Sequence, residues 1–173
     1  MNHSLKEQLT SAFDEIRVEM PGETRIVITA KKDAVLSILS FLKNHGYSHL
    51  GLISCVDWIE EKAFEVVYIL SAYMQEDEKY TDKEKMNIIL KTKISREKSQ
   101  FLSVIPIFEN AEPYEREIHE LFGVRFEGHP RLTPLFLERE YEIPPFRKDF
   151  DTRKYVKDVF DSIPLVEKEA ASK

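Results

Sequence analysis

The chain has 173 residues, with 25 Lys and Arg against 31 Asp and Glu, which gives a formal net charge of −6 at pH 7. This acidic balance argues against a general nucleic-acid binder, whose binding surface would be a basic stripe. The length is enough for one domain with a true core, because folding at this size buries roughly 68–70% of the extended-chain surface. Cys55 is the only cysteine. It excludes an internal disulfide, and since an iron–sulfur cluster takes about four thiolate ligands, this chain cannot hold one alone.

Uncharged runs in the chain are short. The longest, residues 34–42 and 44–56, fall below the roughly 18 apolar residues that a membrane-spanning helix requires. Residues 1–10 contain no apolar core of a secretory signal. We therefore expect a cytoplasmic protein without a membrane span. If it meets the inner face of the cell membrane, it does so through other subunits.

The first part of the chain predicts two helices around a strand. Residues 4–18 carry apolar side chains at helical spacing, and the Pro-Gly step at 21–22 is expected to end that helix. Residues 24–29 alternate and are rich in β-branched side chains, which predicts a strand. Residues 34–44 predict a second amphipathic helix with Asp33 as its N-cap.

Three strands are predicted next, at residues 51–60, 63–71 and 86–93. A tight acidic turn is expected between the first two strands. The polar stretch 75–85 is expected to be a mobile loop between the last two. Cys55 lies in an apolar run of the first of these strands and is interpreted as a buried small hydrophobe.

The following segment contains the clearest predicted helix. Residues 100–108 are apolar with a proline inside, so a helix and an edge segment both remain possible there. Pro113 suits a first helical position, and Gly123 can supply a left-handed C-terminal cap, which predicts a helix over residues 113–122. Residues 124–126 look extended. The apolar stripe of the predicted helix consists of Tyr114, Ile118, Leu121 and Phe122.

The other side of this helix is dense in charge. Glu115 with His119 and Arg116 with Glu120 are spaced for two i,i+4 pairs, each worth about 0.2–0.5 kcal/mol when exposed. That is too little to explain so many charged side chains on stability grounds. The sequence therefore predicts that this helix contacts a partner or a cofactor.

The same segment carries a recognisable pattern of residues. It reads Glu115-Arg-Glu117, Glu120, Phe122-Gly-Val124, Phe126 and a turn at Gly128-His-Pro130. This resembles the signature of the 30 kDa subunit of NADH dehydrogenase, a component of respiratory complex I. Pro145-Phe-Arg-Lys-Asp-Phe150 resembles the closing element of that family, and Val56-Asp57 with residues 64–70 is similar to its central hairpin. The resemblance covers roughly residues 25–150.

One departure from the family pattern bears on which member the chain resembles. After His129-Pro130 the family usually continues Asp-Leu-Arg-Arg, whereas residues 131–134 here read Arg-Leu-Thr-Pro. This favours the short form of the subunit, which occurs in archaeal and bacterial membrane-bound, energy-converting hydrogenases and in related sulfur-reducing complexes.

The resemblance implies a non-catalytic structural subunit in the peripheral arm of a complex-I-like oxidoreductase that couples electron transfer to ion translocation. Such a subunit packs against the large hydrogenase-like subunit and the small iron–sulfur subunit, and reaches membrane antiporter-like subunits only indirectly. Iron–sulfur clusters are expected in those partners and no cofactor in this chain. The partner-binding residues that the resemblance implies are Glu115, Arg116, Glu117, His119, Glu120, Phe126, His129, Arg147, Lys148 and Asp149.

The order of elements predicts an α+β fold in which helices pack on one mixed β-sheet. We expect a core domain at residues 1–131 and an extended arm at residues 132–173, where prolines interrupt a charged, aromatic-rich stretch. The arm is expected to wrap around a neighbouring subunit. An arm folded back on its own domain is the alternative. Residues 167–173 are expected to be a frayed end.

The sequence leaves two further functions to consider. One is a stand-alone adaptor or assembly factor that binds a partner outside any redox complex. The other is a small metal-dependent hydrolase, suggested by His119 and His129 near acidic residues. Glu115 and His119 offer a single i,i+4 ligand pair, and a stable zinc site needs a third ligand. Because phosphate-loop and nucleophile-elbow motifs are also missing from the sequence, no catalytic site is predicted.

Overall fold

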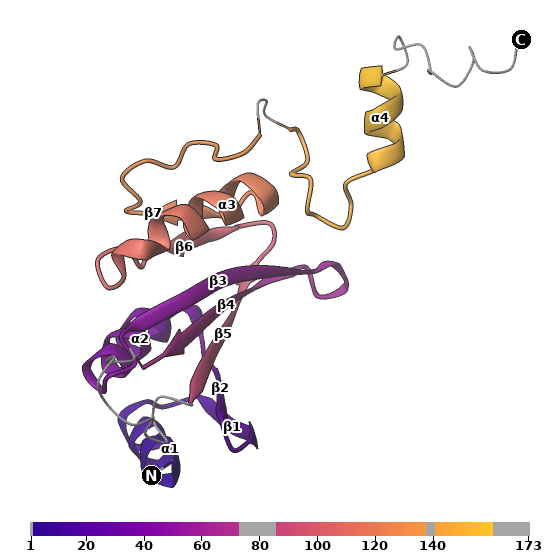
Figure 1. Cartoon of the computed structure of the whole chain (residues 1–173). Helices are drawn as coiled ribbons and strands as arrows, with labels where there is room; N and C mark the ends of the chain where they lie inside the picture. The colour runs from indigo at the N-terminus through magenta and orange to yellow at the C-terminus, as the bar shows by residue number, and fades with distance from the viewer. Residues whose placement is uncertain (1, 73–85, 138–140, 161–173) are drawn as a thin grey trace, which may run out of the picture.

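A mixed sheet of five strands forms the centre of the molecule (Figure 1). The computed structural model describes residues 2–72, 86–137 and 141–160. The strand order is β1-β2-β5-β4-β3, with β2 and β5 parallel and all other neighbours antiparallel. The strands are β1 (Arg17–Gly22), β2 (Arg25–Thr29), β3 (His49–Trp58), β4 (Ala63–Ser71) and β5 (Asn87–Ser95). The predicted α+β class with one mixed sheet of this kind is confirmed.

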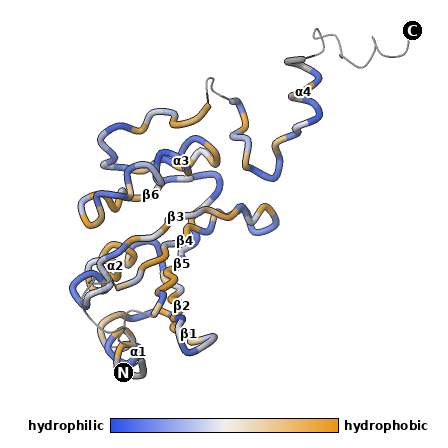
Figure 2. Tube along the Cα trace, in the orientation of Figure 1, coloured by the Kyte–Doolittle hydropathy of each residue, from blue (hydrophilic) through white to orange (hydrophobic). Residues whose placement is uncertain are grey.

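One face of this sheet is covered and carries the core. Side chains alternate strictly along β4, because successive residues of a strand point to opposite faces. The inward set of β4 is fully buried: Phe64, Val66, Tyr68 and Leu70. Helices α1 (Asn2–Ala12) and α2 (Val35–Asn44) bury their apolar sides in the same core cluster. Figure 2 shows the corresponding hydrophobic stretches in α2 and in the strands.

A second layer covers the remaining part of the inward face. It contains the parallel two-stranded sheet β6 (Gln100–Leu102) and β7 (Arg125–Glu127), together with helix α3 (Glu112–Phe122). Short 3-10 turns occur at η1 (Lys32–Ala34), η2 (Ile59–Glu61) and η3 (Glu109–Ala111). Residues 100–108 thus begin as a strand, and the extended interpretation of that segment is the correct one for its first three residues.

The prediction for the N-terminal region was wrong in two respects. The first helix ends at Ala12, and residues 17–22 form strand β1 in place of a continued helix. Glu15 has a left-handed backbone, with φ of 58°, so the chain reverses there. Pairing with β2 then satisfies the backbone of β1, which local helical spacing could not anticipate. Asp33 lies inside η1, and no side-chain hydrogen bond caps α2.

Cys55 has 8% of its surface exposed and belongs to the core cluster. Burial raises the pKa of its thiol to about 12, followed by the effect of the nearby Asp57 carboxylate, while Arg147 opposes the rise. The predicted buried thiol is confirmed, and its raised pKa disfavours the thiolate, which is the reactive form.

The arm leaves β7, runs back beside α3 and then leads to helix α4 (Thr152–Phe160), which stands apart from the sheet (Figure 1). Helix α4 was not predicted from the sequence. The predicted loop at 75–85 and the predicted frayed end at 167–173 lie outside the described residues.

Candidate partner-binding surface

Helix α3 forms for the reasons that its sequence suggests. A proline occupies its first turn, acidic side chains lie near its N-terminus, and Gly123 ends it with a left-handed φ of 75°. The Gly123 N–H donates to the His119 carbonyl oxygen at 2.8 Å. Ile118 and Leu121 are buried against the core. The predicted helix over residues 113–122 is therefore correct to within one residue at its start.

The expected pair between Glu115 and His119 is wrong. Glu115 points into the core with none of its surface exposed, and its Oε1 accepts the Val104 N–H at 2.7 Å. Its Oε2 is buried and, within the described part of the chain, has no hydrogen-bond partner. Burial raises the pKa of Glu115 to about 7, against the opposing effect of the Val104 N–H. His119 turns instead to the Val124 carbonyl oxygen, to which its Nδ1 donates at 2.9 Å.

Glu115→Gln should remove a pH dependence of stability. Between the ordinary carboxyl pKa of 4.5 and about 7, the folded chain retains a proton that the unfolded chain releases. The free energy of unfolding therefore falls as pH rises through that window and levels off above it. The glutamine side chain does not titrate, so the free energy of unfolding of the variant lacks this pH dependence. At pH 8 the variant should therefore be more stable than the parent chain by on the order of 1–3 kcal/mol.

Urea unfolding of both chains between pH 4 and pH 8 measures this difference. Glu117→Gln is the matched control, because Glu117 lies on the same helix and is only half-buried. Parallel stability curves for the Glu115→Gln variant and the parent chain would contradict a buried, proton-binding carboxyl.

The expected pair between Arg116 and Glu120 is also replaced by other contacts. Arg116 donates from Nε to the Thr133 carbonyl oxygen at 3.0 Å and from Nη2 to the Pro134 carbonyl oxygen at 2.8 Å. Its Nη1 lies 3.4 Å from Glu112 Oε1, one turn earlier on the helix. Only 11% of the Arg116 side chain is exposed. Arg116 therefore holds the first residues of the arm against α3.

Glu120 holds the next residues of the arm. Its carboxylate accepts the backbone N–H groups of Leu135, Phe136 and Leu137 at distances between 2.5 and 3.2 Å. Partial burial acts to raise the pKa of Glu120, but the three N–H donors outweigh it and hold the pKa below its ordinary value. Arg116 thus binds the backbone carbonyl groups, and Glu120 the backbone N–H groups, of residues 133–137 at the start of the arm.

The other predicted residues near α3 have separate places. Phe126 is buried, and its ring lies edge-on to Phe101 with centroids 6.4 Å apart. His129 Nε2 donates to the Glu112 carbonyl oxygen at 3.2 Å, and its Nδ1 accepts the Arg131 N–H at 3.0 Å. Glu117 is half-buried, and across the described ranges it has no hydrogen-bond or ion-pair partner. Of these three side chains, Glu117 alone remains available to a partner.

A second set of contacts fixes the later part of the arm. Arg96 Nε lies 3.0 Å from Asp57 Oδ1, and Arg96 Nη2 lies 2.5 Å from Asp149 Oδ1. Asp57 Oδ2 also accepts the Lys148 backbone N–H at 2.9 Å. The Arg96 guanidinium holds the pKa of Asp149 below its ordinary value through this hydrogen bond. Lys148 and Asp149 therefore anchor the arm to the ends of β3 and β5 in this chain.

The role of Arg96 was missed from the sequence, since it follows a polar strand end and belongs to none of the recognised motifs. Asp57 was noticed only as part of a hairpin pattern. Its one available signal was an acidic residue inside an otherwise apolar strand, where a buried carboxylate requires a cationic partner.

Arg147 connects the arm to the end of α3. Its Nε donates to the Phe122 carbonyl oxygen at 2.6 Å, and its guanidinium carbon lies 5.2 Å from the centre of the Phe64 ring. Burial lowers the pKa of Arg147, and the neighbouring Arg96 charge lowers it further. Phe122 stacks edge-on between Phe64 and Phe146, with centroids 6.0 Å and 5.9 Å apart. This aromatic series leads from the core to the surface.

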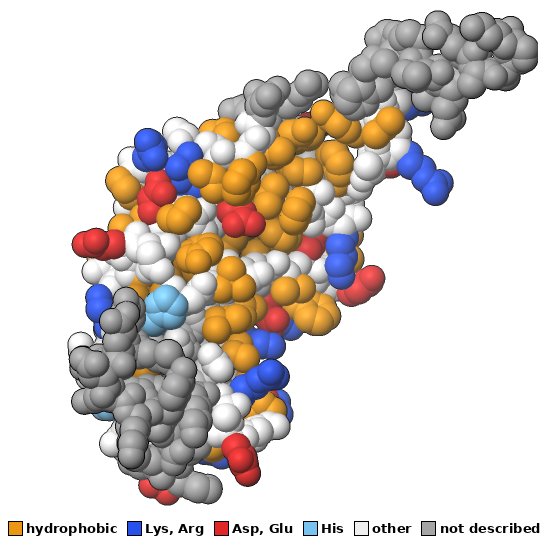
Figure 3. Space-filling model, in the orientation of Figure 1, with side chains coloured by type: hydrophobic (Ala, Val, Ile, Leu, Met, Phe, Trp, Pro, Cys, Tyr) orange, Lys and Arg blue, Asp and Glu red, His pale blue; other side chains and the backbone are white. Residues whose placement is uncertain are grey.

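The held arm exposes large apolar side chains. Phe136 has 66% of its surface exposed and Phe146 has 59%, and Ile143 is also exposed. Figure 3 shows a band of hydrophobic side chains that runs from the arm past α3 to the strands of the sheet. Exposed apolar patches of this kind mark interaction sites in folded proteins. Residues 132–137 and 144–149 themselves lie against their own domain, which is the alternative that the sequence left open for that part of the arm.

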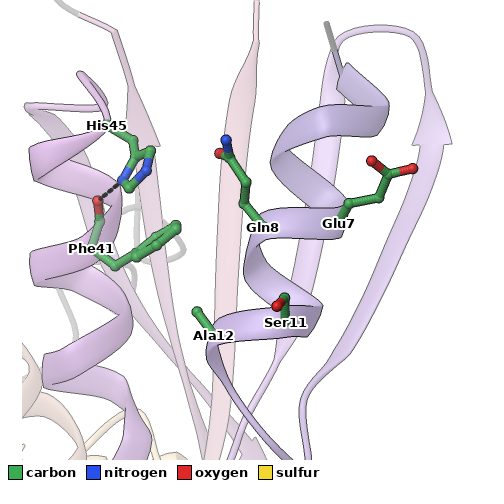
Figure 4. A pocket seen from close by; sticks show the side chains of 6 residues that line it. All are labelled: Glu7, Gln8, Ser11, Ala12, Phe41 and His45. Atoms are coloured by element: carbon green, nitrogen blue, oxygen red, sulfur yellow. Dashed lines mark hydrogen bonds between the residues drawn. The ribbon is translucent and has the colours of Figure 1, made fainter.

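A separate groove lies between α1 and α2, away from α3 (Figure 4). Its lining residues are Glu7, Gln8, Ser11, Ala12, Phe41 and His45. His45 stacks on Phe41, and its Nδ1 donates to the Phe41 carbonyl oxygen at 2.7 Å, so this ring nitrogen is occupied. Across the described ranges, no three His, Cys, Asp or Glu side chains are grouped to hold a metal ion. In the same ranges no helix has the length and apolar character to cross a bilayer.

The fold and this surface define an α+β protein in which the charged helix α3 holds an arm with exposed apolar side chains. Residues 28–156 match the family described as respiratory-chain NADH dehydrogenase, 30 Kd subunit. The chain belongs to this family, and the resemblance found in the sequence is confirmed.

Individual relatives agree with this assignment. The chain is 32% identical over 149 residues to the C subunit of the F(420)H(2) dehydrogenase of Methanosarcina mazei, and the match covers 84% of this chain and 89% of that one. It is 30% identical over 154 residues to the C subunit of the NADH-quinone oxidoreductase of Brucella abortus, covering 88% and 71%. Among solved structures, a chain of the membrane-bound sulfane sulfur reductase, an archaeal respiratory membrane complex, has a TM-score of 0.79 at 27% identity, covering 92% and 91%.

Proposed function

We propose that this chain is a non-catalytic structural subunit in the peripheral arm of a complex-I-like, membrane-bound oxidoreductase. It packs against the large hydrogenase-like subunit and the small iron–sulfur subunit on the cytoplasmic side of the membrane. Those partners carry the iron–sulfur clusters and the redox chemistry, and electron transfer there is coupled to ion translocation. The contribution of this chain is to join and orient the partners.

The observation that carries the proposal is the arm held against α3. Arg116 and Glu120 fix its first residues, and Arg96 fixes Asp149, so that Phe136 and Phe146 are presented on an ordered backbone. Presenting ordered apolar side chains reduces the entropy that is lost when a partner binds. The family match extends over the same region, since it ends at residue 156.

A tagged chain expressed in its native host tests the proposal. It is purified from detergent-solubilised membranes, and the eluate is examined by mass spectrometry and an iron assay. We expect an iron-rich assembly that contains a hydrogenase-like subunit and multi-span membrane subunits. Recovery of the tagged chain alone and free of iron would overturn the proposal and favour an adaptor or assembly factor outside a redox complex.

Arg116→Ala should impair assembly more than it impairs folding. The change removes two hydrogen bonds to the carbonyl groups of Thr133 and Pro134 and the ion pair with Glu112, and it leaves the core of the domain intact. We expect the free energy of unfolding to fall by about 1–2 kcal/mol, while the yield of assembled complex falls about tenfold. The two readouts are chemical unfolding of the pure chain and the amount of partner recovered per tagged chain.

The matched control is Arg131→Ala, because Arg131 is exposed and makes only a 3.5 Å contact with Glu112. It should leave both readouts unchanged. Normal assembly of the Arg116→Ala variant would contradict the importance of the held arm.

A further inference from the structure

The outward face of the central sheet is not covered by any described helix. All three helices that pack on the sheet, α1, α2 and α3, contribute buried side chains to the one core cluster on its inward face. The outward side chains of β4 and β5 alternate with that core and are only half-buried or exposed. An antiparallel sheet with one open face normally presents polar side chains on it.

This face is instead apolar across its middle. The strand register places Leu52 opposite Ile69, Ile69 opposite Ile89, and Ile89 opposite Val27. These four residues form one continuous row across β3, β4, β5 and β2, and we call this row the apolar belt. It exists because a bulge between Leu50 and Leu52 turns Leu52 to the outward face, while Leu50 stays in the core.

Further apolar side chains extend the belt toward the arm. Val67 lies next to Ile69 on the outward side of β4, and Val56 and Trp58 continue along the outward side of β3. Trp58 is 38% exposed, and the Lys148 ammonium of the arm lies 5.8 Å from the centre of its ring. The belt therefore joins the surface of the arm at its Trp58 end.

The charged side chains around the belt indicate which kind of partner could bind this face. Arg17, Arg25, Lys91 and Lys93 are the outward cations of these strands, and Glu19 and Glu65 are the outward anions. Arg17 pairs with Glu19, and Lys93 pairs with Glu61 of the adjoining turn. Arg25 and Lys91 have no acidic partner among the described residues, and Glu65 has no basic one, so the charges named here leave this face with a small positive excess in a chain of net charge −6. Two such faces repel each other, which disfavours a second copy of this chain.

We propose that the open face of the sheet is a second docking surface, occupied in the complex by a protein subunit with an apolar patch bordered by carboxylates. This inference rests on the proposed function and adds to it, because it places a partner on the face opposite α3. The belt would form the desolvated centre of the interface, and Arg25 and Lys91 would meet acidic side chains at its rim.

Photo-cross-linking in the purified native complex tests the inference. The photoreactive amino acid p-benzoylphenylalanine replaces Leu52 in one tagged chain and Val56 in another, since both side chains are exposed. The control position is Ser11 on α1, which is also exposed but lies on a helix of the covered face. We expect both belt positions to yield a cross-link to another subunit at least ten times more strongly than Ser11.

The rim is tested separately with the double variant Arg25→Glu and Lys91→Glu. We expect the same complex to lose at least tenfold in recovery at low salt, while the pure variant unfolds at the parent's denaturant midpoint. A recovered complex in which the belt cross-links to nothing, to its own chain or to a second copy would overturn this inference alone. Recovery of the tagged chain without partners would overturn the proposed function and the docking surface with it.

Discussion

Replacing Arg96 with methionine is expected to lower the free energy of unfolding by about 3–5 kcal/mol. Asp57 has 2% of its side chain exposed, and Arg96 is its cationic partner at 3.0 Å. Methionine keeps the packing against Phe64 but leaves the carboxylate buried, with the Lys148 N–H as its one remaining hydrogen bond among the described residues. An uncompensated buried charge is among the few causes of such large losses from a single substitution. Urea unfolding of the pure chain at pH 7 measures the loss.

Arg17→Met is the matched control for this experiment. Arg17 also makes a short ion pair, with Glu19 at 2.6 Å, but the two side chains are 75% and 50% exposed. Exposed pairs contribute about 0–1 kcal/mol, so this variant should unfold close to the parent. If both arginine variants lost the same free energy of unfolding, the burial of Asp57 would not explain the contribution of its ion pair with Arg96.

Gly123→Ala is expected to cost about 2–3 kcal/mol, which combines two effects. The left-handed φ of 75° strains any residue with a Cβ. A Cβ at this position would also lie 2.7 Å from Arg147 Nη2 and 3.0 Å from Pro144 Cγ. Arg147 cannot move aside freely, because its Nε is bonded to the Phe122 carbonyl oxygen and its guanidinium lies over the Phe64 ring.

Two other glycines separate these effects. Gly128→Ala shares the left-handed strain, with φ of 85°, but its Cβ would meet only Ser103 Cβ at 4.0 Å. Gly22→Ala meets nothing within 4 Å and has no positive φ. The expected order of destabilisation is Gly123 above Gly128 above Gly22, measured by thermal unfolding. If Gly123→Ala and Gly128→Ala lower the stability equally, the close contact of the arm with the end of α3 would be contradicted.

Local sequence patterns were sufficient to predict those helices and strands for which a single pattern, helical or alternating, fits the residues. Helix α3 has a proline at its start, a glycine at its end and a single apolar stripe, and it was found within one residue. Strands β4 and β5 follow from alternation and β-branched residues. The first two residues of strand β1 were assigned to a helix, because Phe13 and Ile16 continue the helical spacing of Leu5 and Leu9. Only pairing with β2 decides between the two periods.

The candidate surface was predicted in outline and not in its contacts. Ten residues were singled out, and they lie on helix α3, on and just after strand β7, and on the arm. The sequence could not tell that Glu115 points inward, because its hydrogen-bond partner, the Val104 N–H, reaches it only in the folded chain. Nor could it pair Arg96 with Asp149, since contacts between residues so far apart in the chain leave no local periodicity.

The parallel contact between β2 and β5 also constrains the order in which the strands can pair during synthesis. Arg25 pairs with Asn87, and Thr29 pairs with Lys91, so the N-terminal hairpin has no place in the sheet until β5 has been made. Strands β3, β4 and β5 are sequential antiparallel neighbours, so they can pair without the N-terminal hairpin. A polypeptide stalled before residue 87 therefore presents two unmatched strand edges, one on β2 and one on β4, which are the surfaces that chaperones and aggregation compete for.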